Sequence, residues 1–227
     1  EIPNFTSDLI NDSKFVTSSD LLAENVGYDS TTVKDTLDSL LYEAINITSF
    51  TSNVEPVQEI GTNINSITLT WKLSQPATEQ FINDVPVTGS SFTFDTPFNS
   101  NKSFTLKVND GTTIKSKTID IKFMNNIYYG VSSSTTYDSN FIESLTKELR
   151  QATEMNFRVN AGKDEYICFA YPSHYGEAVF SVGGFEGGFR EVAKFYYTNE
   201  SGYNEQYIVY CSDNPCLGDT RVKVIYV

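Results

Sequence analysis

The sequence predicts a mainly β, modular chain: a short N-terminal helix or coiled coil, a β-sandwich, and a C-terminal α+β domain rich in strands. Residues 66–73 alternate apolar and polar side chains, the two-residue period of a half-buried strand. Hydrophobic residues make up 39% of the chain, enough to build packed cores. Of the 14 tyrosines, twelve follow residue 126, which marks the last part as compositionally distinct. We expect boundaries at 1–50, 51–124 and 125–227.

The charge of the chain excludes two classes of partner. The formal net charge is −13. Nucleic acid and anionic membrane surfaces are both bound through Lys and Arg, so neither fits a chain this acidic. No apolar run approaches the roughly 20 residues that a membrane-spanning helix needs. We therefore expect no nucleic-acid binding and no membrane insertion.

A helix is predicted to begin after residues 29–32, which offer several N-cap side chains. Apolar side chains then recur in steps of four and three, the a/d spacing of a coiled coil. They are Val33, Leu37, Leu40, Ala44 and Ile47. Two interpretations remain open: an amphipathic helix packed on its own domain, or a short parallel coiled coil that sets an oligomer.

Residues 51–124 predict a small sandwich. Ile67, Leu69, Trp71 and Leu73 share one face of a strand. Residues 92–94 and 103–108 behave likewise, and the hairpin turn at 109–111 leads to a strand over 113–123. About six or seven strands around a single tryptophan are typical of an immunoglobulin-like or fibronectin-like sandwich. We expect a spacer or adhesion module here.

The last part predicts strands around one helix. The helix is expected from 138 to about 150, because Asp138 can cap it and Phe141, Leu145 and Leu149 form one stripe. The expected strands are 127–131, 155–159, 165–171, 177–182, 189–197, 203–211 and 220–227. This order predicts a mixed, β-rich domain.

Aromatic residues of this domain are the candidate recognition surface. Tyrosine combines a large contact area with a polar tip, which suits binding of sugars or proteins, but it also fills β cores. Residues 182–189 place two Gly-Gly pairs around Phe185 and Glu186, as either a structural corner or a ligand-contacting loop. The candidate receptor-binding residues are Tyr171, His174, Tyr175, Phe185, Glu186, Phe189 and Tyr203.

Cysteine and histidine content argues against a metal site or cofactor. The single histidine rules out the usual His-rich metal sites, and the three cysteines are too few for a disulfide scaffold and badly spaced for zinc. Cys211 and Cys216 flank a turn-forming stretch and could form a disulfide, although free thiols fit equally well. We predict no metal and no cofactor.

Several short motifs, taken in order, resemble those of tailed-bacteriophage structural proteins. Residues 5–13 and 15–20 resemble linker repeats of tail and fibre proteins, 31–40 the short helix that follows them, and 66–71 the Ig-like module of many virion proteins. A further set of residues resembles a C-terminal domain that recurs in phage fibre-like proteins: 160–162, 166, 170–172, 182–189, 199, 202–203, 207 and 210.

This resemblance implies a virion appendage such as a head or tail fibre, exposed on the particle exterior. It implies a homotrimer, attached to other virion proteins through its N-terminal segment, whose C-terminal end binds a host-surface glycan or protein. A purely structural capsid-decoration or tail-assembly protein is the alternative.

An enzyme is the third possibility, and the resemblance carries no catalytic residues. Glu186 with Glu191, or Asp164 with Glu165, offer paired carboxylates. Glycosidase chemistry needs such a pair about 5–10 Å apart across a cleft, which closeness in sequence does not establish. We therefore expect no enzymatic activity.

Overall fold

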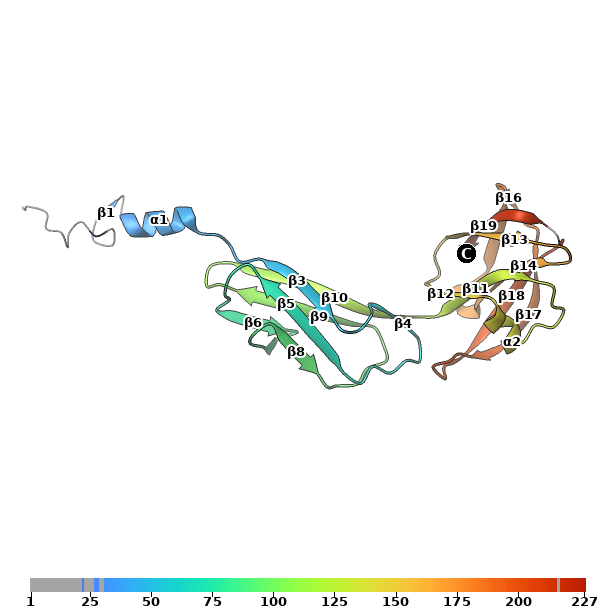
Figure 1. The fold of residues 1–227 in the computed structure, drawn as a ribbon, viewed down its shortest axis with the longest axis horizontal. Helices are drawn as coiled ribbons and strands as arrows, with labels where there is room; N and C mark the ends of the chain where they lie inside the picture. Colours follow the sequence, from blue (N-terminus) through green and yellow to red (C-terminus); the bar gives the residue numbers. More distant parts are fainter. Residues whose placement is uncertain (1–21, 23–26, 29–30, 216) are drawn as a thin grey trace, which may run out of the picture. The chain divides into compact units, whose positions relative to one another are not determined.

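The computed structural model describes residues 22, 27–28, 31–215 and 217–227, and these form a mainly β protein, as predicted (Figure 1). Contacts divide the chain into two compact units, 1–45 and 46–227. The predicted repeat at 5–20 and Cys216 lie outside the described residues.

The first unit contains one helix. β1 (Gly27–Tyr28) pairs with β2 (Thr31–Thr32), and α1 (Val33–Leu41) follows. Thr32 caps α1: its hydroxyl accepts a hydrogen bond from the Asp35 N–H at 3.1 Å, and the Asp35 carboxylate accepts one from the Thr32 N–H. The hydrogen bonds to Thr32 lower the pKa of Asp35. The helix therefore begins where the sequence predicts.

The helix is shorter than its apolar spacing predicts. It ends at Leu41, so Ala44 lies beyond it, and Ile47 opens a strand in which its side chain is buried. The prediction of a helical stripe through both residues is wrong, because strand pairing of Ile47 with Leu73 overrides the heptad spacing.

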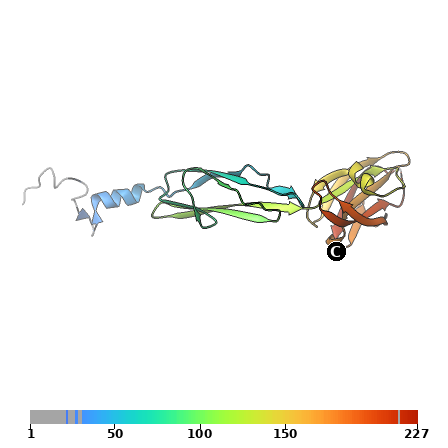
Figure 2. The same cartoon turned by 90° about the horizontal axis from the view of Figure 1, so that it is seen from below.

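Residues 47–124 form two sheets, which Figure 2 shows as two layers. One sheet has the order β3-β5-β8, and the other β4-β10-β9-β6-β7, with β4 parallel to β10. The strands are β3 (Ile47–Ser52), β4 (Val57–Glu59), β5 (Ile67–Leu73), β6 (Glu79–Ile82), β7 (Val85–Pro86), β8 (Ser91–Phe94), β9 (Lys102–Asn109) and β10 (Ile114–Met124).

The core between these sheets follows from alternation along the strands. Ile67, Leu69 and Trp71 of β5 are buried, as predicted, and Phe104 of β9 is fully buried. The Trp71 indole N–H donates to the Gln80 side chain at 2.7 Å, which satisfies its polar atom.

Residues 126–226 form two further sheets. Their orders are β12-β11-β14-β18-β17 and β13-β19-β15-β16. The strands are β11 (Asn126–Ser132), β12 (Thr146–Leu149), β13 (Met155–Ala161), β14 (Tyr166–Pro172), β15 (Ala178–Val182), β16 (Phe185–Glu186), β17 (Phe189–Thr198), β18 (Asn204–Ser212) and β19 (Gly218–Tyr226). The short helices are α2 (Ser139–Ser144) and η2 (Ser173–Tyr175).

The predicted helix over 138–150 is correct only in its first half. Asp138 caps α2 through the Phe141 N–H at 3.0 Å, but α2 ends at Ser144. Residues Thr146–Leu149 are a strand because they pair with β11, from Asn126 to Tyr129.

The sheet β12-β11-β14-β18-β17 is buried on both faces, which explains the concentration of aromatic residues in this part of the chain. One face packs against the four-stranded sheet around Phe157, Phe169 and Phe180. The opposite face packs under Phe141 and Ile142 of α2. β14, in the middle of the sheet, is buried at six of its seven positions.

The structure forms a disulfide between Cys168 of β14 and Cys211 of β18, which are direct cross-strand neighbours. The suggested Cys211–Cys216 disulfide is therefore wrong. The sequence could not show this, because the register between two strands 43 residues apart brings Cys168 to Cys211.

Candidate functional site

The loop after β4 contacts the turn between β17 and β18, and these contacts build one side of a pocket. The Ile60 N–H donates to the Met124 carbonyl at 2.9 Å, and the Asn199 side-chain amide donates to the Ile60 carbonyl at 2.8 Å. The hydroxyls of Thr62 and Ser201 lie 3.0 Å apart. The loop is thus held by its backbone as well as by its side chains.

A close approach at Gly61 fits this loop against Tyr203. Gly61 has φ +96°, and a Cβ there would lie only 2.7 Å from the Cβ of Tyr203. Tyr203 itself is fixed by Asn199, whose side-chain oxygen accepts from the Tyr203 N–H at 2.8 Å. Glycine is required here both for its positive φ and for the absence of a side chain.

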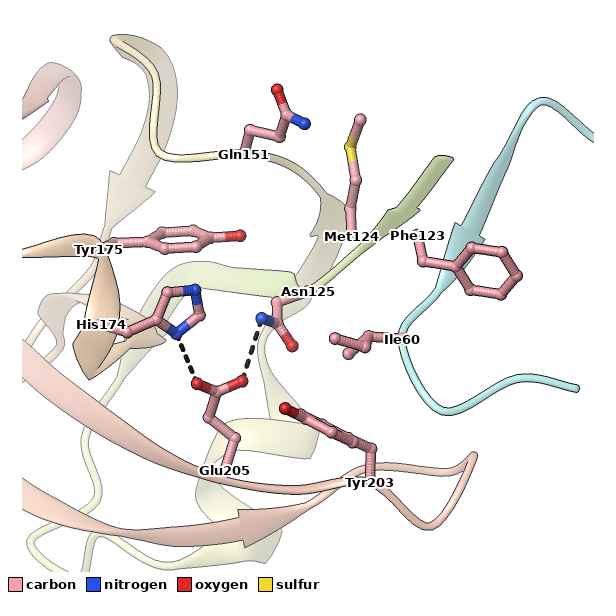
Figure 3. Close-up of a pocket in the computed structure, with 9 residues that line it drawn as sticks. All are labelled: Ile60, Phe123, Met124, Asn125, Gln151, His174, Tyr175, Tyr203 and Glu205. Atoms are coloured by element: carbon pink, nitrogen blue, oxygen red, sulfur yellow. Dashed lines mark hydrogen bonds and ion pairs between the residues drawn. The ribbon is translucent and has the colours of Figure 1, made fainter. Parts of the chain in front are cut away.

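The resulting pocket has a volume of about 430 Å³, within the usual range for small-molecule sites (Figure 3). Its wall is half apolar or aromatic and half polar. The lining residues are Ile60, Phe123, Met124, Asn125, Gln151, His174, Tyr175, Tyr203 and Glu205.

Glu205 of β18 is the polar centre of the pocket. Figure 3 shows the side chains of His174 and Asn125 pointing at its carboxylate. The Asn125 amide donates to one oxygen at 3.1 Å, and the His174 Nδ1 contacts the other. Because a carboxylate only accepts, this contact requires a hydrogen on Nδ1. Neutral His174 then keeps Nε2 as an acceptor.

Local structure explains why His174 and Tyr175 reach the pocket. Pro172, in extended conformation, precedes the single turn of η2, and Gly176 ends it at φ +93°. The Tyr175 hydroxyl donates to the Arg150 carbonyl at 2.6 Å. Burial raises the pKa of the Tyr175 hydroxyl, so it stays protonated and remains a donor at neutral pH.

Three of the seven candidate recognition residues, His174, Tyr175 and Tyr203, come together around this pocket. Tyr171 does not: its side chain is fully buried, and its hydroxyl donates to the Gly176 carbonyl at 3.1 Å. The prediction that Tyr171 contacts a receptor is wrong. The sheet is covered on both faces at β14, so every side chain of this strand from Ile167 onward is buried.

The other three candidates lie elsewhere. Phe189 is half-buried and stacks on Phe180 with ring centroids 4.4 Å apart. Phe185 is 81% exposed, and with Glu186 it borders a shallow hollow of about 200 Å³. Added Cβ atoms at both Gly-Gly pairs would meet nothing within 4 Å. Glycine is therefore favoured at these positions because the turn requires positive φ values, and not because neighbouring atoms leave no room for a side chain.

Sequence reasoning missed Asn125, Gln151 and Glu205. A signal existed for Asn125, because the Asn125-Asn126 pair interrupts two strand-like apolar runs. Glu205 follows Tyr203 by two residues, so both belong to one face of the same extended segment. Gln151 carried no such signal, since it follows a segment predicted as helix.

The carboxylate pairs considered for catalysis do not line the pocket. Glu186 is on β16 and Glu191 on β17, which belong to different sheets. Glu165 accepts a hydrogen bond from the Gly162 N–H at 2.8 Å and so closes the turn before β14. In the described part of the chain, no three His, Cys, Asp or Glu side chains gather in a way that could hold a metal.

The candidate oligomerisation residues are split by the fold. Leu37 and Leu40 lie on α1 and are 47% and 76% exposed, and Val33 is partly exposed at its start. Leu41 is 76% exposed beside them. α1 has no buried residue, so the described part of the chain leaves its apolar face uncovered. No helix among the described residues has the length and apolar character needed to cross a membrane.

Comparison of the chain with protein-family models, curated proteins and solved structures finds no match.

Proposed function

We propose that this chain is a non-enzymatic subunit of a tailed-phage appendage that recognises a glycan or protein on the host surface. The observation that supports the recognition role is the pocket around Glu205, where the candidate residues His174, Tyr175 and Tyr203 come together. Its mixture of aromatic walls and convergent polar groups is typical of ligand sites. In this proposal, the chain lies on the exterior of the virion.

The middle part would be an immunoglobulin-like spacer. Its strand order supports this: the sheet β3-β5-β8 faces the sheet β4-β10-β9-β6-β7, and both sheets are mainly antiparallel. The first two strands of this part, β3 and β4, belong to different sheets. Buried side chains from both sheets, Trp71 of β5 and Phe104 of β9 among them, form its core. A spacer that also carries the Ile60 loop would present the recognition pocket at its end.

Self-association would use α1. A nine-residue helix is too short to be stable by itself in water, and it gains stability mainly by burying an apolar face. Leu37, Leu40 and Leu41 offer such a face, and three symmetry-related copies could bury it together. The segment before it would attach the trimer to other virion proteins.

The oligomeric state tests this part of the proposal. Light scattering of the purified chain is expected to give three times 25.4 kDa. Leu40→Asp should dissociate the trimer, whereas Ser39→Ala, on an exposed polar position of the same helix, should not. A monomer of unchanged fold would contradict the appendage assembly.

Binding to cell envelopes tests recognition. The chain is expected to bind envelopes from some members of a panel of Gram-positive and Gram-negative bacteria. A folded trimer that binds none of them would favour the purely structural alternative.

A further inference from the structure

We infer that the pocket around Glu205 takes a neutral saccharide, a mono- or disaccharide unit of a larger glycan. This rests on the proposed recognition function and deepens it, by choosing one ligand class where a glycan and a protein were both open. Four properties of the lining favour such a ligand: its charge, its donors and acceptors, its aromatic walls and its rigidity.

Charge excludes acidic ligands. Carboxylate and phosphate groups are recognised by Arg or Lys, and none of the nine described lining residues is either. Glu205 is the acidic residue of the lining, and its carboxylate contacts the His174 ring. Glu59, which accepts from Ser201 at 3.2 Å beside the pocket, adds negative charge nearby. Acidic sugars and phosphodiester polymers would be repelled.

The polar groups match hydroxyls. A sugar hydroxyl both donates and accepts, so a site for it needs both kinds of partner close together. Glu205 supplies carboxylate oxygens, Asn125 and Gln151 supply amides, and His174 supplies a ring nitrogen. In Figure 3 these side chains border one space, with the hydroxyls of Tyr175 and Tyr203 also directed into it.

The apolar walls match the C–H faces of a sugar ring. Tyr203 is 39% exposed and stands opposite the edge formed by His174 and Tyr175 (Figure 3). Ile60 and Met124 complete the apolar side. Aromatic rings provide a large contact area with little loss of conformational entropy. A flat protein partner would instead need an interface of about 600–1,000 Å² per side, which a pocket of this size does not offer.

The site is preorganised. The side chains of His174 and Asn125 are held by Glu205 and that of Tyr175 by the Arg150 carbonyl, while the backbone of Tyr203 is held by Asn199. A ligand therefore does not have to order these side chains when it binds, which lowers the entropic cost of association.

The test is calorimetric titration of the full chain with two sets of sugars at millimolar concentration. The neutral set is glucose, galactose, rhamnose, N-acetylglucosamine and N-acetylgalactosamine with their common disaccharides. The anionic set is glucuronic acid and N-acetylneuraminic acid. We expect at least one neutral member to bind and no anionic member to bind.

Variants locate the binding. Tyr203→Ala and Glu205→Gln should weaken it roughly tenfold or more, the loss expected when a ligand loses contacts to a charged group or an aromatic wall. Tyr203→Phe keeps the ring and should retain most of the affinity. Tyr196→Ala removes a tyrosine that is 67% exposed on β17 outside the pocket, and Glu143→Gln an exposed carboxylate of α2 outside it. Both should leave affinity unchanged, and thermal unfolding checks that each variant is folded.

Three outcomes would overturn the inference: binding of the anionic set alone, neutral binding that the pocket variants leave unchanged, or no binding by folded protein. Envelope binding separates this failure from that of the proposed function. If wild type and Tyr203→Ala bind envelopes equally, the pocket is not the recognition site, but the proposed host recognition is retained. If the pocket binds a sugar but the chain binds no envelope, the saccharide site is supported and the proposed host recognition is contradicted.

Discussion

Replacing Gly61 by alanine probes how the pocket is built. The substitution has two separate costs. The first is backbone strain, because Gly61 has φ +96°, a conformation that residues with a Cβ rarely adopt. The second is steric, because the new Cβ would lie 2.7 Å from the Tyr203 Cβ and 3.2 Å from the Ser201 Cβ.

The structure provides a control that separates these costs. Gly89 has φ +79°, and a Cβ there would meet nothing within 4 Å, so Gly89→Ala carries the strain alone. Strain of this kind costs about 1–2 kcal/mol. A forced close contact adds about 1–3 kcal/mol, unless neighbouring groups shift. Gly61→Ala is therefore expected to lower the free energy of unfolding by about 2–5 kcal/mol, and Gly89→Ala by about 1–2 kcal/mol.

Urea unfolding measures the difference. Trp71 is the only tryptophan and is buried, so its fluorescence reports unfolding of residues 47–124. If the chain relaxes by moving Tyr203, the stability loss shrinks and sugar affinity falls in Gly61→Ala but not in Gly89→Ala. Equal stability losses in both variants, together with unchanged affinity, would refute the role assigned to the close approach.

Three other perturbations test the cores. Replacing Cys168 and Cys211 together by alanine should cost about 4 kcal/mol by loop entropy, since the disulfide closes a 43-residue separation; a loss under about 1 kcal/mol in urea unfolding would contradict this. Phe104→Ala should cost about 3–5 kcal/mol, measured by Trp71 fluorescence, because Phe104 is fully buried. Burial raises the pKa of the Tyr128 and Tyr207 hydroxyls. In the unfolded chain they ionise near pH 10, so stability is fully present below about pH 10 and falls above it. Titration of all 14 tyrosines near pH 10 without loss of structure would contradict the last expectation.

Much of the strand pattern was predictable from the sequence, because alternation of side chains is a local property. Ile67, Leu69 and Trp71 are buried as their spacing predicts, and the turn at 109–111 joins β9 to β10. The cap of α1 and the start of α2 were equally readable, since capping depends on side chains within three or four residues.

Two of the predictions that failed concern the end of an element and burial on a second face. Leu149 fits a helical stripe, but Thr146–Leu149 gains more from pairing with β11. Tyr171 has the composition of a recognition residue, yet β14 is the middle strand of a sheet covered on both sides. Neither outcome is encoded in neighbouring residues.

The sequence by itself determined a mainly β chain with an aromatic last part, because side-chain period and composition are carried by short segments. Only the tertiary structure decided the partner of Cys211 and the assembly of the pocket. Ile60, Asn125, His174 and Glu205 come from four separate segments of the chain. Their meeting depends on strand order and register, which arise from long-range packing and not from local preference.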